Sequence, residues 1–318
     1  MLIDLPSGRT CWLIGDPHLG RKFEVGVPLH RRGEREARQL EKFVEELATP
    51  CDVNVMVGDL FEHPHVGHSV VVAAAQAYLE AAERHPDTMF IAMPGNHDLP
   101  RNLGVVGAWD AFEEIVRDRY DNLYVDRSPA VLDDEIAIFP WEWGVSALEQ
   151  VEQHSYLFRE GQIAIGHWDL KSYGGDDSHL APVKALSELG IADFYSGHYH
   201  LEGDYEVDGY TVHCTGSLEP YTHAEDATGE TYQTLSLEGV LANPEALKDK
   251  CVRVILQPGE ELPSDIDCLA MTAKRAAADE GETEQVSFST FDWQKIMEDA
   301  LKGLDPEVKN FITDRLTG

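Results

Sequence analysis

Short apolar runs alternate with amphipathic segments through most of the chain. The runs are too short for helices, and each is followed at once by Gly, Asp, Asn or His. The strands that they predict are Cys11–Ile14, Val53–Val57, Met89–Met93, Ile163–Ile165 and Ala192–Tyr195. Between them, segments with apolar residues about every 3.6 positions predict helices. These are Arg31–Ala48, Ser69–Glu83 with Ser69 as N-cap, Val105–Asp118, Ser146–Arg159 and Val183–Leu189. The alternation predicts an α/β layered domain.

The pattern changes toward the C-terminus. Asp208-Gly209 lies between two alternating segments and predicts a β-hairpin, which Tyr232–Leu237 continues as an antiparallel sheet. Beyond it we expect a strand at Cys251–Leu256 and a helix at Ala270–Ala278. We therefore predict a main domain at 1–240, a small α/β appendage with an acidic linker at 241–284, and a helical pair at 285–318. That pair either folds back on its own domain or presents an apolar stripe to a partner.

Composition places the chain among globular proteins, with 318 residues of which 43% are hydrophobic. No run of about 18 apolar residues occurs, so no membrane span is expected. The start of the chain lacks the pattern of a secretory signal. Five scattered cysteines without a C-x-x-C spacing favour reduced thiols and a cytoplasmic location.

The charge is strongly acidic: 25 basic and 58 acidic residues give a formal net charge of −33. This argues against a protein that holds nucleic acid on a broad basic surface of its own. A nuclease stays compatible, because bound divalent ions or a partner subunit can supply positive charge. A source whose proteins are acidic in general, or a salt-rich cytosol, explains the charge equally well.

Five clusters of oxygen and imidazole side chains follow the expected strands. They are Asp16-Pro17-His18, Gly58-Asp59-Leu60-Phe61-Glu62, Gly95-Asn96-His97-Asp98, Gly166-His167 and Gly197-His198-Tyr199-His200. Each alone is more often turn chemistry than a ligand, but all five at strand ends predict a dinuclear metal site. Such ligands suit Mn, Fe, Zn or Mg, and Asp59 is the natural bridge between ions roughly 3.5 to 4 Å apart.

The ordered clusters resemble the calcineurin-like metallophosphoesterase superfamily over Cys11 to about His223. The resemblance implies a four-layer sandwich of two mixed β-sheets flanked by helices. It also implies two metal sites that share Asp59. The first is Asp16, His18, Asp59 and His200, and the second is Asp59, Asn96, His167 and His198. His97 would protonate or stabilise the leaving oxygen, and Asp98 would orient His97.

Flanking residues narrow the resemblance to the SbcD nuclease family and the recombination endonuclease small subunit of tailed phages. The similar stretches are Asp16 to Gly20, Arg35, Gln39 and Phe43, Ala192 to Ser196 and Thr215 to Tyr221. The resemblance implies a Mn²⁺-dependent 3′ to 5′ exonuclease on double-stranded DNA and an endonuclease on single strands, with Mg²⁺, Fe²⁺ or Zn²⁺ as other metals. It places the enzyme in DNA recombination, repair or end processing in a prokaryotic or phage-infected cell.

The resemblance also implies a partner. Residues 241–284 would be a reduced capping region, and 285–318 would dock on an SMC-like ATPase subunit of the SbcC type; a homodimer is compatible as well. One departure lies three residues after Asp59, where members of the family often carry His or Asp and this chain has Glu62, followed by His63, His65 and His68. His63 and His65 either contact DNA or lie in a solvated loop. Alternatives are a small-substrate phosphodiesterase or phosphatase of the same superfamily and a non-enzymatic assembly subunit. His97 argues against the last, because a structural metal site needs no such residue.

Overall fold

The first β-sheet carries three of the five clusters at one edge. The computed structural model describes residues 1–102, 104–171, 177–226 and 228–276. The sheet has the order β1-β2-β3-β4-β5, with β1 antiparallel to β2 and the other neighbours parallel. Its strands are β1 Leu2–Asp4, β2 Thr10–Ile14, β3 Val53–Met56, β4 Met89–Ala92 and β5 Leu123–Val125. Because parallel strands end at the same edge, the loops after β2, β3 and β4 meet there.

The second sheet carries the two remaining clusters. Its order is β10-β11-β9-β8-β7-β6, and β7, β8 and β9 are parallel. Its strands are β6 Ala130–Leu132, β7 Ile136–Phe139, β8 Ile163–Gly166, β9 Asp193–Ser196, β10 Gly203–Val207 and β11 Tyr210–Cys214. The predicted hairpin is confirmed, since β10 and β11 pair antiparallel around Asp208 and Gly209, both with positive φ.

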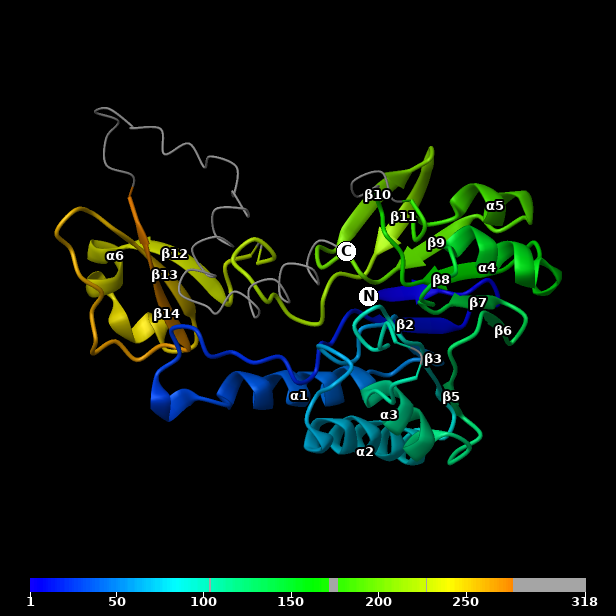
Figure 1. Ribbon diagram of the computed structural model, residues 1–318, viewed down its shortest axis with the longest axis horizontal. Helices are drawn as coiled ribbons and strands as arrows, with labels where there is room; N and C mark the ends of the chain where they lie inside the picture. Colours follow the sequence, from blue (N-terminus) through cyan, green and yellow to red (C-terminus); the bar gives the residue numbers. More distant parts are fainter. Residues whose placement is uncertain (103, 172–176, 227, 277–318) are drawn as a thin grey trace, which may run out of the picture. The chain divides into compact units, whose positions relative to one another are not determined.

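The two sheets pack face to face with helices outside. The core between them is almost entirely aliphatic: Leu13, Val53, Val55, Val57, Ile91, Ile136, Ile138, Ile163 and Ile165 are among its buried members. Helices α1 Glu34–Leu47, α2 His68–Arg84 and α3 Ala108–Val116 share a core with the first sheet, and α4 Ala147–His154 and α5 Val183–Glu188 share one with the second. Figure 1 shows α1, α2 and α3 together on one side of the strands. The predicted four-layer sandwich is confirmed.

Helices α2 and α4 differ in whether a serine side chain caps their first turn. The predicted N-cap Ser69 is wrong: α2 begins at His68, after Gly67, and no side chain caps it. Ser146 does cap α4, because its hydroxyl accepts a hydrogen bond from Glu149 N at 3.1 Å while Glu149 accepts one from Ser146 N. A Ser near an expected helix start therefore caps the helix only where, like Ser146, it directly precedes the first helical residue.

The appendage corrects two predictions. Strands β12 Tyr232–Ser236, β13 Cys251–Leu256 and β14 Ala270–Arg275 form a separate three-stranded sheet. The first correction is that β12 pairs in parallel with β13, after a crossover through α6 Leu237–Ala242 and a 3₁₀ turn at Pro244–Leu247, instead of continuing the antiparallel sheet. The second is that the expected helix at Ala270–Ala278 is strand β14 over its first six residues. Met271 is buried in the appendage core and its N–H binds Gly26 O, which outweighs helix propensity.

The appendage sheet thus begins before residue 240, and Met1–Lys274 forms one compact unit. The division at 240 and 284 stays a prediction, and the helical pair at 285–318 lies outside the described residues. Short 3₁₀ turns also occur at Leu29–Arg31 and Ser155–Leu157. Within the described residues no helix has the length and apolar character that a membrane crossing requires.

Candidate metal centre

The seven predicted ligands meet where the two sheets end. Asp16 and His18 follow β2, Asp59 follows β3 and Asn96 follows β4, while His167, His198 and His200 follow β8 and β9. His167 Nε2 lies 3.4 Å from Asp59 Oδ2 and 3.0 Å from Asn96 Oδ1. His18 Nε2 lies 3.0 Å from His200 Nε2 and 3.6 Å from Asp59 Oδ2. Three groups of side chains have possible ligand atoms within 4.8 Å of one another: Asp16–His18–His200, Asp59–His167–His198 and His18–Glu62–His97.

In each of the four histidines, the ring nitrogen that faces away from the other ligands contacts an oxygen atom. The pairs are His18 Nδ1 with Glu62 Oε2 at 3.1 Å, His200 Nδ1 with Glu225 Oε1 at 3.6 Å, His198 Nε2 with Asp169 Oδ1 at 2.9 Å and His167 Nδ1 with Val57 O at 2.9 Å. The contact of His167 is a hydrogen bond, and the other three are ion-pair contacts with a carboxylate. Proteins hold metal-binding imidazoles with such outer oxygen atoms, which orient the ring and point the other nitrogen inward. The inward nitrogens are then free to bind cations.

Three of the ligands lie on backbone with left-handed φ: 47° at His18, 51° at Asp59 and 73° at His198. Non-glycine residues in that region cost on the order of 1–3 kcal/mol each, and such strain concentrates at functional sites. The first two loops hold each other in place, since His18 N donates to Asp59 O at 2.9 Å and Leu19 N donates to Leu60 O at 2.8 Å. The strain therefore sets where the ligand atoms point.

Gly95 allows the third loop to approach the second. A Cβ atom at residue 95 would lie 2.2 Å from Asp59 Oδ1 and 2.4 Å from Asp59 N. The first cannot move without leaving the centre, and the second is backbone. Only glycine fits between Asp59 and the start of the Asn96-His97 turn.

Asp16 tests whether cations fit the centre. Its side chain is fully buried, and neither carboxylate oxygen has a hydrogen-bond partner. Burial raises the pKa of Asp16, partly opposed by the nearby His167. A buried carboxylate without donors is costly in any protein, whereas a divalent cation between Asp16, His18 and His200 satisfies it. The donor set of two carboxylates, one amide and four imidazoles fits a pair of divalent metal ions.

Asp59 and His167 support the second position. Burial disfavours the Asp59 carboxylate, but His167 and His18 beside it hold the pKa of Asp59 well below its usual range. Likewise, burial favours neutral His167, yet the Asp59 carboxylate raises the pKa of His167 to about 9. The fold thus stabilises negative charge on Asp59 and positive charge next to it, where a cation can replace the proton on His167.

His97 and Asp98 have different surroundings. His97 Nδ1 lies 2.6 Å from Glu62 O, so it must donate there, because a carbonyl oxygen only accepts. Its Nε2 is then the nitrogen that can deliver a proton. Asp98 is buried and accepts from the N–H groups of Leu60, Phe61 and Gly95, and burial, with Asp59 nearby, raises the pKa of Asp98 to about 8. The expected contact of Asp98 with His97 is therefore corrected: Asp98 fixes the backbone of two loops.

Several residues that support the site had no definite role from the sequence, although Asp169 lies beside a ligand and Gln39 and Tyr221 belong to the stretches that resemble the nuclease family. Glu225 follows no motif, and its pairing with His200 depends on a loop that returns to the site. Asp169 is two residues after His167, a position that gives no signal of its own. Gln39 and Tyr221 reach the first loop from distant elements and donate to Pro17 O at 2.9 and 2.7 Å. Of the three loop histidines, His63 lines a cavity with Asn96 and His97, while the N–H of His65 points to His63 Nδ1.

Two face-packed sheets whose strand ends gather this donor set define a dinuclear metallohydrolase. The calcineurin-like phosphoesterase family model matches residues 10–202, and the chain belongs to that family. It is therefore a metal-dependent phosphoester hydrolase. No curated protein matches the chain. A crystal structure of the *Pseudomonas putida* nuclease MPE is similar, with 16% identity, a TM-score of 0.31, and coverage of 70% of this chain and 82% of that one. A likeness this low carries no conclusion about activity.

Proposed function

We propose that the chain is a metal-dependent DNA nuclease. The observation that supports this most is a cationic, aromatic cavity of about 260 Å³ beside the metal centre. Its charged and ring-bearing lining comprises Arg21, Lys22, Phe23, Arg35, Tyr221, His223, Tyr232 and Arg253. Among the described residues that line it, Glu24 is the one acid. In a chain of net charge −33, this local excess of positive charge suits a phosphodiester backbone.

The cavity adjoins the metal centre through one aromatic ring. The ring of Tyr221 lies 5.4 Å from His18 and 5.6 Å from His200, and the Arg21 guanidinium lies 4.7 Å above it. Arg21 pairs with Glu62 and Arg35 pairs with Glu219, whereas Lys22 and Arg253 enter no ion pair with any described residue. Two unpaired cations in a cavity that adjoins the metal centre favour a substrate that carries further phosphates.

Different residues of the chain would bind the metal ions, donate the proton and position the loops. Asp16, His18, Asp59 and His200 would hold one ion, and Asp59, Asn96, His167 and His198 the other. When bound, the ions supply positive charge for the phosphoryl oxygens and for an attacking water. His97 delivers a proton from Nε2 to the departing sugar oxygen, while Glu62 O keeps the ring oriented. Asp98 keeps Asp59 and His97 in register by holding both loops.

The first test is cleavage of an end-labelled DNA duplex in the presence of Mn²⁺. We expect shortening from the 3′ end that EDTA abolishes, and a His97→Ala rate about 100- to 10,000-fold lower at unchanged metal content. No cleavage of duplex or single-stranded DNA, alongside turnover of bis(p-nitrophenyl) phosphate, would replace this proposal with a small-substrate phosphodiesterase. Full activity of His97→Ala would overturn its assigned role.

The second test addresses the cavity. Arg253→Ala should raise KM for DNA and reduce the slope of log affinity against log salt by about 1, as expected for one phosphate contact. Lys184→Ala is the matched control. Lys184 is also a surface cation, but it lies on α5 and pairs with Asp208 in the turn between β10 and β11. Equal effects of the two substitutions would remove the cavity as support for DNA.

Mn²⁺ preference, cleavage polarity, the role in recombination or repair, and an SMC-like ATPase partner are parts of the proposal that rest on the resemblance. The ATPase would supply DNA-binding surface that the acidic chain lacks. Adding such an ATPase should increase cleavage of long duplexes, and truncation after residue 284 should abolish that increase while leaving cleavage by the chain alone. An unchanged increase after truncation would contradict docking through 285–318.

A further inference from the structure

A second surface continues from His97, away from the cavity just described. It consists of two hollows that share Leu99 and Trp143. One, of about 250 Å³, is lined by His63, Asn96, His97 and Arg101. The other, of about 260 Å³, is lined by apolar Pro100, Val105 and Trp141 and by the polar side chains of Asp110, Arg127, Ser128 and Glu142. The surface therefore begins at the proton donor and ends in a hollow of mixed polarity.

Trp143 is held rigidly in the middle of this surface. Its indole N–H donates to Leu99 O at 2.9 Å, and Leu99 directly follows the Asn96-His97-Asp98 turn. Trp141 supports it edge to face at 5.3 Å and itself stacks on His179 at 3.7 Å. The half-buried ring of Trp143 is thus fixed relative to the loop that carries His97.

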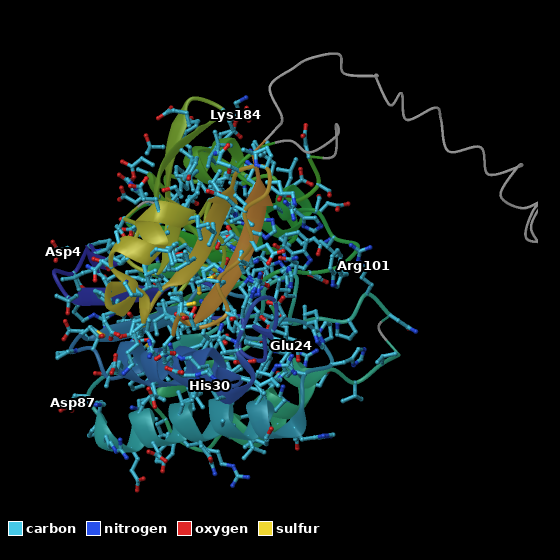
Figure 2. The ribbon with its side chains drawn as sticks, turned by 90° about the vertical axis from the view of Figure 1, so that its left-hand side faces the viewer. Asp4, Glu24, His30, Asp87, Arg101 and Lys184 are labelled. Atoms are coloured by element: carbon cyan, nitrogen blue, oxygen red, sulfur yellow. The ribbon has the colours of Figure 1, made fainter. Side chains whose placement is uncertain are left out.

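Arg101 adds an exposed cation beside the fixed ring. Its guanidinium lies 4.8 Å from the centre of the Trp143 ring, and none of the ion pairs among described residues includes it. The side chain is exposed, and Figure 2 shows Arg101 at the periphery of the molecule, far from Asp4 and Lys184. A flat ring and an unpaired guanidinium together match a nucleobase with its phosphate.

We propose that Trp143 and Arg101 form the subsite for the nucleoside attached to the departing oxygen. This inference rests on the proposed nuclease function. Since His97 protonates the departing oxygen, the group attached to that oxygen must lie in the hollow next to His97. Its base stacks against Trp143 or the Arg101 guanidinium, and its outer edge meets the hollow of mixed polarity at Pro100 and Val105. Stacking tolerates every base, so the subsite requires a base without selecting one.

The test uses oligonucleotides with a single cleavable phosphodiester and an abasic residue on one side of it or the other. For the wild-type chain, loss of the base on the departing side should slow single-turnover cleavage by roughly 5- to 100-fold relative to the intact substrate, the range of one stacked base. Loss of the other base should change the rate less. Trp143→Ala should bring the intact-to-abasic ratio close to one, Trp143→Phe should keep part of it, and Arg101→Ala should reduce it.

The ratio is internal to each variant, so a general loss of activity does not affect it. Tyr156→Ala, which removes an aromatic side chain that is 79% exposed elsewhere, is the control and should keep the wild-type ratio. A readout without cleavage is the fluorescence of 2-aminopurine at the same position with EDTA present. It should be quenched on binding to the wild type and to Tyr156→Ala, but not to Trp143→Ala.

The outcomes separate the two proposals. DNA cleavage with a ratio near one in the wild type, or an unchanged ratio in Trp143→Ala, contradicts the subsite and leaves the nuclease function standing. A wild-type chain that cleaves no DNA and turns over only small diesters contradicts both. Ratios that fall in Trp143→Ala and persist in Tyr156→Ala support the subsite.

Discussion

Asp16 in the metal centre and Arg31 in the joint between α1 and the appendage are both buried charged residues. Arg31 has acceptors on every side: both oxygens of Glu34 at 2.8 Å, Asp267 Oδ1 at 3.2 Å and the carbonyl of Lys248. Asp16 is more deeply buried, yet its carboxylate oxygens have no hydrogen-bond partner. One buried charge is satisfied by the chain, and the other is not.

The difference separates a structural contact from a binding site. A buried ion pair that the chain completes holds two parts of a fold together and needs nothing further. A buried carboxylate without donors is costly unless it takes up a proton or binds a cation. The left-handed backbone at His18, Asp59 and His198 also belongs to the binding site, because the strain there orients the ligand atoms.

The largest expected effect comes from closing the space that the metal centre requires. Gly95→Ala places a methyl group against Asp59 and should lower phosphodiesterase activity by roughly 1,000-fold or more, as expected when the several kcal/mol supplied by metal ions are lost. Metal content measured by elemental analysis should fall with it.

Gly67→Ala is the matched control, since a Cβ atom there meets nothing closer than Ser69 Oγ at 3.8 Å. It should keep its metal and its activity and lose less than about 1 kcal/mol of stability at the start of α2. A fully active, metal-loaded Gly95→Ala chain would show that Asp59 does not hold a cation at this position.

An intermediate effect is expected where the chain only supports a ligand. Glu225→Gln removes the carboxylate behind His200 and should weaken metal binding by about 10- to 100-fold, measured by metal titration, with near-normal turnover at saturating metal. Glu80→Gln, an exposed carboxylate on α2 paired with Arg84, is the control. Equal metal affinities in the two variants would mean that Glu225 does not support His200 and only holds its loop through the hydrogen bond from Tyr221 N.

The smallest expected effect is on stability, at the contact between α1 and the appendage where Glu34 pairs with Arg31 and Arg38. Hydrogen bonds from Arg31 and then Arg38 lower the pKa of Glu34 to about 2 from an ordinary value of 4.5. A carboxyl with a lowered folded pKa adds stability above its unfolded pKa and loses it as the pH falls toward the folded pKa. Glu34→Gln should therefore cost at most about 1 kcal/mol at pH 7, and the difference from wild type should vanish between about pH 4.5 and pH 2.

Chemical denaturation at several pH values measures this difference. Glu41→Gln, which removes an exposed carboxylate from the same helix, is the control for the change of charge. A Glu34→Gln penalty that persists at pH 2 would mean that packing, and not the ion pairs with Arg31 and Arg38, accounts for it.

Local patterns in the sequence predicted the α/β layering and the gathering of the ligand clusters, whereas the four-layer sandwich was implied by the family resemblance. An apolar run followed by Asp16, Asp59 or Asn96 indicates a strand end, and parallel strands end at one edge. The sequence did not predict β14, whose Ala- and Met-rich composition favours a helix until Met271 joins the appendage core. Nor did it predict Glu225 behind His200 or the backbone contacts of Asp98. These depend on where distant loops return, which no spacing along the chain records.

The central claim is that the buried donors at the sheet edge form a cation site, and thermal unfolding of the wild type and Asp16→Asn tests it most directly. In EDTA, the variant should unfold at the same or a higher temperature, because it lacks an unpaired buried charge. With saturating Mn²⁺ the order should reverse, since a ligand that binds the folded state stabilises the wild type by mass action. A wild-type chain that gains nothing from Mn²⁺, and that is already the more stable of the two in EDTA, would contradict the claim.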